Sequence, residues 1–217
     1  MIEVALEASG RPGSVAARRA DKLLVTELGA GAAHASDLLS ALDHLVADLG
    51  GKPSDVSAIF VGTGPGSFTG LRVAIATAQG MALGTNAELR SVSSFEAFIF
   101  GALGVGEEAY VVSDAFSSEL HLAQYRREEC EVSTLTAPQV VPAGPIEVSS
   151  VMRVFGDAKG LRAAKLEELA RALPFSTPSA RHVLELGAVR LAEFGREQPD
   201  SVEPLYLRPF AAKKRRR

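Results

Sequence analysis

A glycine-rich stretch between a short apolar run and a helix-forming segment constrains the fold of this chain more than any other feature. The run at residues 58–61 is continuously apolar, which is typical of a strand buried on both faces of a parallel sheet. Residues 62–72 read GTGPGSFTGLR, and a helix is expected after them, through about residue 84. This order of strand, loop and helix predicts an α/β fold. It also makes the loop a candidate anion site, because free N–H groups and the helix dipole favour negative charge there.

The loop does not match either common nucleotide motif. A Walker A loop that began at Gly62 would have Ser67 in place of its second glycine, and a dinucleotide fingerprint that began at Gly64 would have Thr69 in place of its third. A conventional NTPase or NAD site is therefore not expected. In a simpler interpretation, which stays open here, the glycines form a tight turn and a hydroxyl caps the next helix. The candidate loop residues are Gly62, Gly64, Pro65, Gly66, Ser67, Phe68, Thr69 and Gly70.

Two segments of this region are predicted to be helices. Residues 34–49 place their leucines and a valine on one stripe of helical spacing. Residues 70–84 are rich in alanine and glycine, and glycine inside a helix costs about 1 kcal/mol relative to alanine. Small residues let a second backbone approach closely, so we expect tight helix packing here. The pattern leaves open whether the packing partner belongs to the same chain.

The rest of the chain also alternates strands and helices, which predicts two small α/β lobes. Strands are expected at residues 2–7, 14–17, 109–112, 120–125, 154–157 and 205–207, the first two as a hairpin. Further helices are expected at residues 95–103, 161–173 and 180–194, and loops at residues 26–33 and 138–145. The glycines between residues 101 and 106 indicate the boundary between the two lobes. We therefore expect an N-terminal lobe at 1–104, with 205–217 as a candidate addition, and a smaller C-terminal lobe at 105–204.

Charge is distributed unevenly along the sequence. The net charge is −3, but residues 213–217 read KKRRR, and without them 18 basic residues stand against 26 acidic ones, a balance of −8. An acidic body argues against a broad nucleic-acid-binding face. We expect the tail to be a disordered, solubilising end, with contact to phosphates as the alternative. No apolar run is long enough for a membrane helix, and no signal peptide or disulfide framework is evident, so a cytoplasmic protein without membrane contact is expected.

Catalytic signatures are missing from the sequence. No two histidines stand four residues apart, so a metallopeptidase-type ligand pair is not expected, and the loop lacks the spacing of a nucleophile elbow. Asp114 and Glu119 are a candidate carboxylate pair across a turn, and Asp157 is a candidate phosphate neighbour. A structural role, in which these carboxylates accept backbone hydrogen bonds, is favoured for all three.

The loop block at 62–72, together with SVSSFEA at residues 91–97, closely resembles the TsaB (YeaZ) family. Weaker similarity extends along nearly the whole chain, including DA at 114–115 with Glu119, and PLYLR at 204–208. The resemblance implies an actin-like (ASKHA) two-lobe fold with a degenerate second lobe. It also implies a non-catalytic role beside a TsaD-like paralogue and a TsaE-like ATPase, in making N6-threonylcarbamoyladenosine (t6A) in tRNAs that read codons starting with A. A stand-alone small actin-like ATPase or phosphotransferase is the alternative.

The resemblance carries further expectations for this chain. No cofactor is expected in it, because ATP and metal would belong to the partner subunits, and tRNA would be reached through the complex. The first two helices of the N-terminal lobe would form the partner interface, and the same surface would form a homodimer in the chain alone. The residues expected there are Leu38, Leu42, Leu45, Leu71, Arg72, Ile75, Ala78 and Ala82.

The chain also departs from the family pattern. The first strand ends in Glu7-Ala8-Ser9 where the family has Asp-Thr-Ser, so the carboxyl is one methylene further out and a hydroxyl is missing. Phe116 and His121 stand where the family has Arg and Tyr. These changes argue against a nucleotide held by this subunit.

Overall fold

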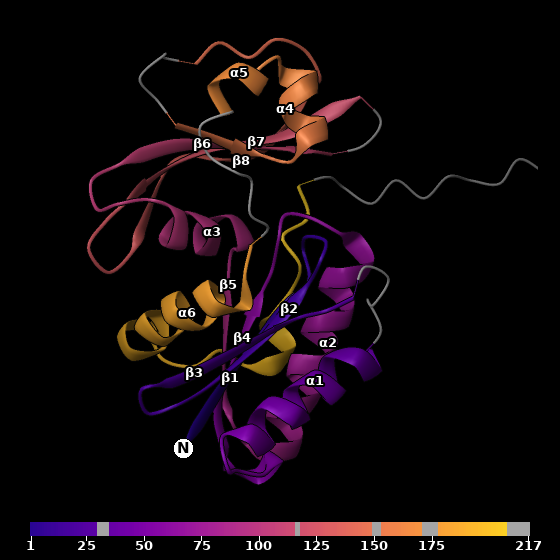
Figure 1. Cartoon of the computed structure of the whole chain (residues 1–217), viewed down its shortest axis with the longest axis vertical. Coiled ribbons are helices and arrows are strands. Elements are labelled where there is room, and N and C mark those ends of the chain that lie inside the picture. The colour runs from indigo at the N-terminus through magenta and orange to yellow at the C-terminus, as the bar shows by residue number, and fades with distance from the viewer. Residues whose placement is uncertain (30–34, 116–117, 149–152, 171–177, 208–217) are drawn as a thin grey trace, which may run out of the picture.

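The computed structural model describes residues 1–29, 35–115, 118–148, 153–170 and 178–207. The described chain forms two β-sheets with helices between and outside them (Figure 1). Among the described residues, no helix is both long and apolar enough to cross a membrane.

The first sheet has five strands in the order β3-β2-β1-β4-β5. Their bounds are β1 (Ile2–Glu7), β2 (Ser14–Arg19), β3 (Lys22–Glu27), β4 (Val56–Gly62) and β5 (Glu88–Val92). The first three strands form an antiparallel meander, whereas β4 and β5 run parallel to β1. The central strands β1 and β4 are buried on both faces, as the apolar run at 58–61 predicted.

Helices cover both faces of this sheet. On one face lie α1 (Ala35–Asp48) and α2 (Phe68–Thr85), whose inward side chains share a core with Val4, Leu6 and Ile59. On the other face lies α6 (Ala180–Phe194), packed with α3 (Ser94–Ala102) against Phe60 and Ala5. Two single-turn helices, η1 (Pro53–Asp55) and η2 (Pro199–Ser201), join the larger elements.

The second sheet has four strands in the order β8-β7-β6-β9. Their bounds are β6 (Glu108–Asp114), β7 (Glu119–Arg127), β8 (Val132–Pro142) and β9 (Arg153–Gly156). One face of this sheet shares the core of α3 and α6, while the other is covered by α4 (Ala158–Ala164) and α5 (Glu167–Ala170). Helices and sheets therefore alternate in five layers, with α3 and α6 in the middle one (Figure 1).

The chain crosses from one sheet to the other and then returns. All strands of the first sheet precede residue 104, and all strands of the second follow it. The helix α6 lies within the range expected for the C-terminal lobe, 105–204, and it packs mainly on β1 and β4 of the first sheet. Arg190 on α6 binds Glu96 of α3 at 2.8 Å and Glu131 beside β8 at 2.6 Å. The largely buried guanidinium of Arg190 thus ties three parts of the chain together.

Most expected elements are confirmed, and α6 has the predicted bounds with Ser179 as its N-cap. Other expectations are wrong in part. A loop is expected at 26–33, but β3 continues through Glu27, and residues 30–33 lie outside the described residues. A loop is expected at 138–145, but β8 continues through Pro142. Residues 205–207, where a strand is expected, form none; the Leu205 N–H donates to the Thr63 carbonyl (2.8 Å), and the Tyr206 ring lies against that of Phe68.

The helix expected at 161–173 is divided. It breaks after Ala164 because Lys165 adopts a left-handed conformation (φ 57°) that ends α4. Residues 171–173 lie outside the described residues, as do Phe116 and the basic tail at 213–217.

Candidate functional site

The glycine-rich loop after β4 is held by its own backbone contacts. The Gly64 N–H donates to Ser94 Oγ (3.0 Å), and the Ser67 N–H donates to the Ser9 carbonyl (2.8 Å). Ser67 is the N-cap of α2, since its hydroxyl accepts from the Gly70 N–H (3.3 Å). Three N–H groups that a phosphate cradle would use are therefore engaged within the protein, in agreement with the turn-and-cap interpretation.

The glycines of this loop allow a close approach of the segment that follows β1. A Cβ atom on Gly66 would lie 2.4 Å from the Ser9 carbonyl oxygen, and one on Gly70 would lie 2.1 Å from the Ala8 carbonyl oxygen. A side chain at either position would therefore force the backbone at residues 8–9 to shift. The loop is thus fitted against residues 8–9, and Gly62, Gly64, Pro65 and Gly70 are buried while Gly66, Phe68 and Thr69 are exposed.

Glu7, where the family pattern has aspartate, points into the protein. Its side chain is fully buried and accepts from the Ser9 N–H (2.6 Å) and from Ser94 Oγ (2.7 Å). Burial raises the pKa of the Glu7 carboxyl, although the hydrogen bonds from Ser9 and Ser94 act against this shift. The carboxyl lies where a Cβ on Gly62 would be, 2.0 Å from Glu7 Oε2. The longer side chain therefore links β1, β4 and α3.

A cleft of about 610 Å³ lies between the loop and the second sheet. Its second-sheet wall carries three charged side chains that contact one another or nearby backbone. Asp157 caps α4 by accepting from Gly160 N–H (2.7 Å) and also accepts from Asp114 N–H (2.7 Å), while Lys159 Nζ lies 2.5 Å from Asp114 Oδ2. The structural role expected for Asp157 is therefore confirmed. The cleft is lined by Ser9, Gly10, Arg11, Pro65, Gly66, Ser67, Phe68, Thr69, Phe95, Ser113, Asp114, Asp157, Lys159 and Pro178.

His121 lies behind this wall. Its Nδ1 is 3.2 Å from the hydroxyl oxygen of Ser113, which lines the cleft. Burial lowers the pKa of the His121 imidazole, although Asp157 and Asp114 act against this shift. Within the described residues, no three His, Cys, Asp or Glu side chains are grouped so that they could hold a metal ion. His34 lies outside the described residues, whereas His182 packs against Gly101.

The residues expected at a partner interface lie mostly in the core of the chain itself. At most 6% of each of seven residues is exposed, and their side chains lie in or beside the core between α1, α2 and the first sheet: Leu38, Leu42, Leu45, Leu71, Ile75, Ala78 and Ala82. Only Arg72 of the expected set is exposed. Both predicted helices exist, but the leucine stripe marks the inward face of α1.

The outward face of α2 differs from that of an ordinary surface helix. Of its 18 residues only Arg72 is charged, and its exposed positions include Ala76, Gly80, Leu83 and Gly84. A helix that is apolar on all sides is typically buried. The scarcity of charge along residues 68–85 is the signal that could have identified this face from the sequence.

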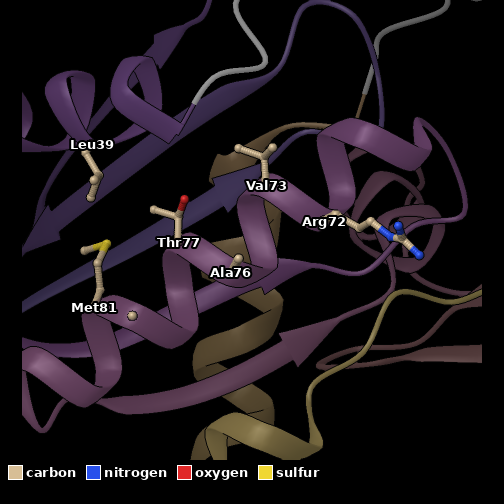
Figure 2. A pocket seen from close by; sticks show the side chains of 7 residues that line it. Leu39, Arg72, Val73, Ala76, Thr77 and Met81 are labelled. Atoms are coloured by element: carbon tan, nitrogen blue, oxygen red, sulfur yellow. The ribbon is translucent and has the colours of Figure 1, made fainter.

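An open groove of about 600 Å³ follows this face between α1 and α2. Figure 2 shows Leu39 reaching from α1 toward Met81 of α2, with Val73 and Thr77 along the same side and Arg72 at one end. The buried Thr77 hydroxyl makes no hydrogen bond. The groove is lined by Leu39, Arg72, Val73, Ala76, Thr77, Gly80 and Met81.

Comparisons with known proteins agree on one family. Residues 29–180 match the family model described as TsaD, tRNA N6-adenosine threonylcarbamoyltransferase. The tRNA threonylcarbamoyladenosine biosynthesis protein TsaB of Haemophilus influenzae is 27% identical over 94% of this chain and 92% of its own length. The protein of the same name from Escherichia coli is 27% identical over 84% of each chain.

Solved structures give the same result. YeaZ from Pseudomonas aeruginosa superposes with a TM-score of 0.79 at 25% identity, over 95% of this chain and 99% of its own. A second Pseudomonas aeruginosa structure, described as an uncharacterized protein with similarity to peptidase YEAZ, superposes with a TM-score of 0.81 and the same identity and coverage. The expected actin-like fold is therefore confirmed.

Proposed function

Because this chain belongs to the TsaB/YeaZ family, we propose that it is the non-catalytic scaffold partner of a TsaD-type subunit in the formation of t6A in tRNA. Family membership gives the chain a role in the biosynthesis of this modified nucleoside. The scaffold role, the partner and the interface are the proposal. The partner subunit supplies the metal and the transferase chemistry, a TsaE-type ATPase joins the pair, and the complex works on tRNA in the cytoplasm.

The outward face of α2 is the observation that carries the proposal. This face has exposed small residues, Ala76 and Gly80, beside the larger Leu39 and Met81 in the groove. Small residues allow a helix of another subunit to approach closely, and the groove walls supply apolar contact area. A face of this length whose one charged residue, Arg72, lies at its end favours a protein partner. In the absence of the TsaD-type subunit, the same face pairs two copies of this chain.

The alternative of a stand-alone ATPase has less support from the geometry. A cleft is present, but Asp114 and Lys159 bind each other, and Asp157 caps a helix. The Glu7 carboxyl is buried under Gly62 and hydrogen-bonded there. A nucleotide would have to displace several of these contacts before it could be held.

Size-exclusion chromatography with light scattering tests the scaffold proposal. The full chain is run alone, with the TsaD-type subunit of its own genome, and as the variant Ala76→Arg. An arginine at this exposed position leaves the fold intact but places a long cation in the groove, so we expect the complex peak to disappear. Ala192→Arg, at an exposed alanine of α6, is the matched control and keeps the complex.

Two results would overturn the proposal. Separate, unshifted peaks for the unmodified chain and the TsaD-type subunit at micromolar concentrations would show that the two proteins do not bind each other. Magnesium-dependent ATP turnover by the chain alone, lost on Gly66→Asp, would favour the stand-alone enzyme. A reconstituted t6A assay that requires this chain, and that fails with Ala76→Arg, would support the scaffold role.

A further inference from the structure

An exposed cluster of two aromatic rings and an arginine lies at the start of α2. The Arg72 guanidinium lies 3.9 Å from the centre of the Phe68 ring and donates from Nε to the Tyr206 hydroxyl (2.7 Å). The two ring centres are 5.6 Å apart, and 45% of each aromatic residue is exposed. Phe68, Arg72 and Tyr206 are called the aromatic–arginine cluster below.

The cluster joins two parts of the chain far apart in sequence. Phe68 and Arg72 come from the start of α2, whereas Tyr206 follows η2. Gln79 of α2 donates from Nε2 to the Val202 carbonyl (3.0 Å), which fixes the segment that carries Tyr206 against the same helix. The cluster is therefore in place before a partner arrives, and this reduces the entropy lost on binding.

The Arg72 side chain has hydrogen-bonding capacity that the chain itself does not use. Its Nε donates within the cluster, but in the part of the chain that the structure describes nothing accepts from its two terminal nitrogens and no carboxylate forms an ion pair with it. By contrast, the exposed Arg162 and Arg181 pair with Glu167 and Glu185. Two terminal guanidinium nitrogens match the two oxygens of one carboxylate.

The cluster continues the outward face of α2. Phe68, Arg72, Ala76 and Gly80 are spaced by four residues, so they follow one side of the helix over about 18 Å. Arg72 also lines one end of the α1–α2 groove, where Figure 2 shows its side chain directed away from Met81. A partner helix that fills this groove would therefore reach the cluster at its end.

We propose that the aromatic–arginine cluster binds the TsaD-type subunit through a carboxylate of that subunit, which accepts from the two terminal nitrogens of Arg72. The same subunit covers the rings of Phe68 and Tyr206. The inference rests on the proposed function and adds to it the chemistry that the partner presents: an acidic side chain flanked by apolar residues, beside the helix that fills the groove.

Covering the cluster makes the carboxylate necessary. A partner that lies on the two rings removes water from the guanidinium, and a charge taken out of water without a partner costs several kcal/mol. A carboxylate bound at both terminal nitrogens replaces that water. The rings then exclude solvent around the ion pair, which strengthens it. Arginine and aromatic residues together are also the residue types that are enriched in protein interfaces.

The charge around the cluster favours a protein over a nucleic acid. Arg72 is the one charged residue among the 18 of α2, and the exposed Glu203 lies three residues before Tyr206. A nucleic acid is held by several clustered cations, whereas α2 supplies one. A single cation beside two rings matches a single carboxylate instead.

Isothermal titration calorimetry of the full chain with the TsaD-type subunit of its own genome tests the inference, at low and at high potassium chloride concentrations. Arg72→Gln should weaken binding about thirtyfold or more at low salt, because it leaves the partner's carboxylate without its cation. The affinity of this variant should also fall less with added salt than that of the unmodified chain. Arg72→Lys keeps the charge but not the planar pair of nitrogens, so it should recover only part of the loss.

Two further variants test the aromatic part of the cluster. Phe68→Leu should weaken binding roughly tenfold at both salt concentrations, because the contact that it removes is apolar. Tyr206→Phe keeps the ring but removes the hydroxyl that holds Arg72, so it should weaken binding about threefold.

Controls come from similar side chains elsewhere on the surface. Arg162→Gln removes an exposed arginine of α4, and Phe194→Leu changes an exposed ring that lies beside Arg90. Both should bind the TsaD-type subunit as the unmodified chain does. All variants should melt within about 2 °C of the unmodified chain, since every altered side chain is exposed.

Three results would overturn the inference while leaving the proposed function standing. Unchanged affinity in both Arg72→Gln and Phe68→Leu, with the complex still abolished by Ala76→Arg, would place the cluster outside the interface. Loss of self-association alone in Arg72→Gln, measured by light scattering, would assign the cluster to a contact between copies of this chain. Weaker binding of a labelled tRNA transcript by a complex that assembles normally with Phe68→Leu would assign the cluster to RNA.

Failure of the proposed function gives a different result. In that case the unmodified chain gives no binding heat with the TsaD-type subunit at either salt concentration, and the inference fails with it.

Discussion

The two sides of the segment at 62–85 use small residues for opposite purposes. On the inner side of the loop, Gly62, Gly66 and Gly70 lie so close to other atoms that a Cβ would come within 2.4 Å of them. On the outer face of α2, Gly80 and Gly84 have nothing within 4 Å of the same position. The inner glycines let parts of one chain touch, whereas the outer ones leave space that nothing in the described chain fills. Small residues within one segment therefore serve internal packing at some positions and leave an open surface at others.

Arginine substitutions on the two faces of α2 should give the largest difference. Ala78 is fully buried, so Ala78→Arg places a charge in the core and should cost more than about 4 kcal/mol or prevent folding. Ala76→Arg, two residues away and exposed, should melt within about 2 °C of the unmodified chain. Thermal unfolding followed by circular dichroism measures both. Equal melting of the two variants would show that Ala78 is not a core residue.

Alanine substitutions of glycine should have effects of opposite sign on the two sides. Gly62→Ala puts a methyl group 2.0 Å from Glu7 Oε2 and 2.9 Å from Ser94 Oγ, and should lower the free energy of unfolding by about 1 to 3 kcal/mol. Gly80→Ala meets nothing and replaces glycine in a helix interior, so it should raise that free energy by about 1 kcal/mol. Urea unfolding gives both free energies. If the two variants lost similar amounts of stability, the proposed difference between the two sides of the segment would be contradicted.

The most gradual expected effect is a pH dependence carried by Glu7. Burial raises its pKa in the folded protein above the ordinary value of 4.5, so the folded chain holds this proton more tightly than the unfolded chain. Its contribution to stability is complete below pH 4.5 and is lost as pH rises toward the folded pKa, by at most about 1.4 kcal/mol per pH unit.

Glu7→Gln isolates this contribution, because the amide does not titrate in this range. The free energy of unfolding of Glu7→Gln minus that of the unmodified chain should increase from pH 4.5 to pH 8 in urea titrations. A difference that stays constant over this range would mean that Glu7 ionises as easily in the folded protein as in the unfolded one.

Elements with strong local signals could be predicted from the sequence, and elements set by neighbours could not. The bounds predicted for α6, residues 180–194, match the structure, and the serine before them, Ser179, is its N-cap. By contrast β8 contains Pro138, which usually argues against a strand. It is tolerated here because β8 is the edge of its sheet and its register shifts between Gln124 and its neighbours on β7. An edge position is a tertiary property that no local pattern carries.

The candidate interface shows the same limit. Helical periodicity identifies the residues that are buried, such as Leu42 and Ile75, but it does not say whether the burial is within the chain or against a partner. The opposite face of α2 carries Ala76 and Gly80, which no hydrophobic pattern selects. These two residues are exposed because the other face of α2 packs on the first sheet and α1.

The return of α6 to the first sheet has a consequence for biosynthesis. Phe60 at the centre of β4 is covered by Gly187 and its neighbours on α6, which are made long after the five strands of that sheet. While the chain leaves the ribosome, this sheet face stays open to water and to other nascent chains until residues 180–194 follow. The core on this face of the first sheet can therefore be completed only after the second sheet has been synthesised.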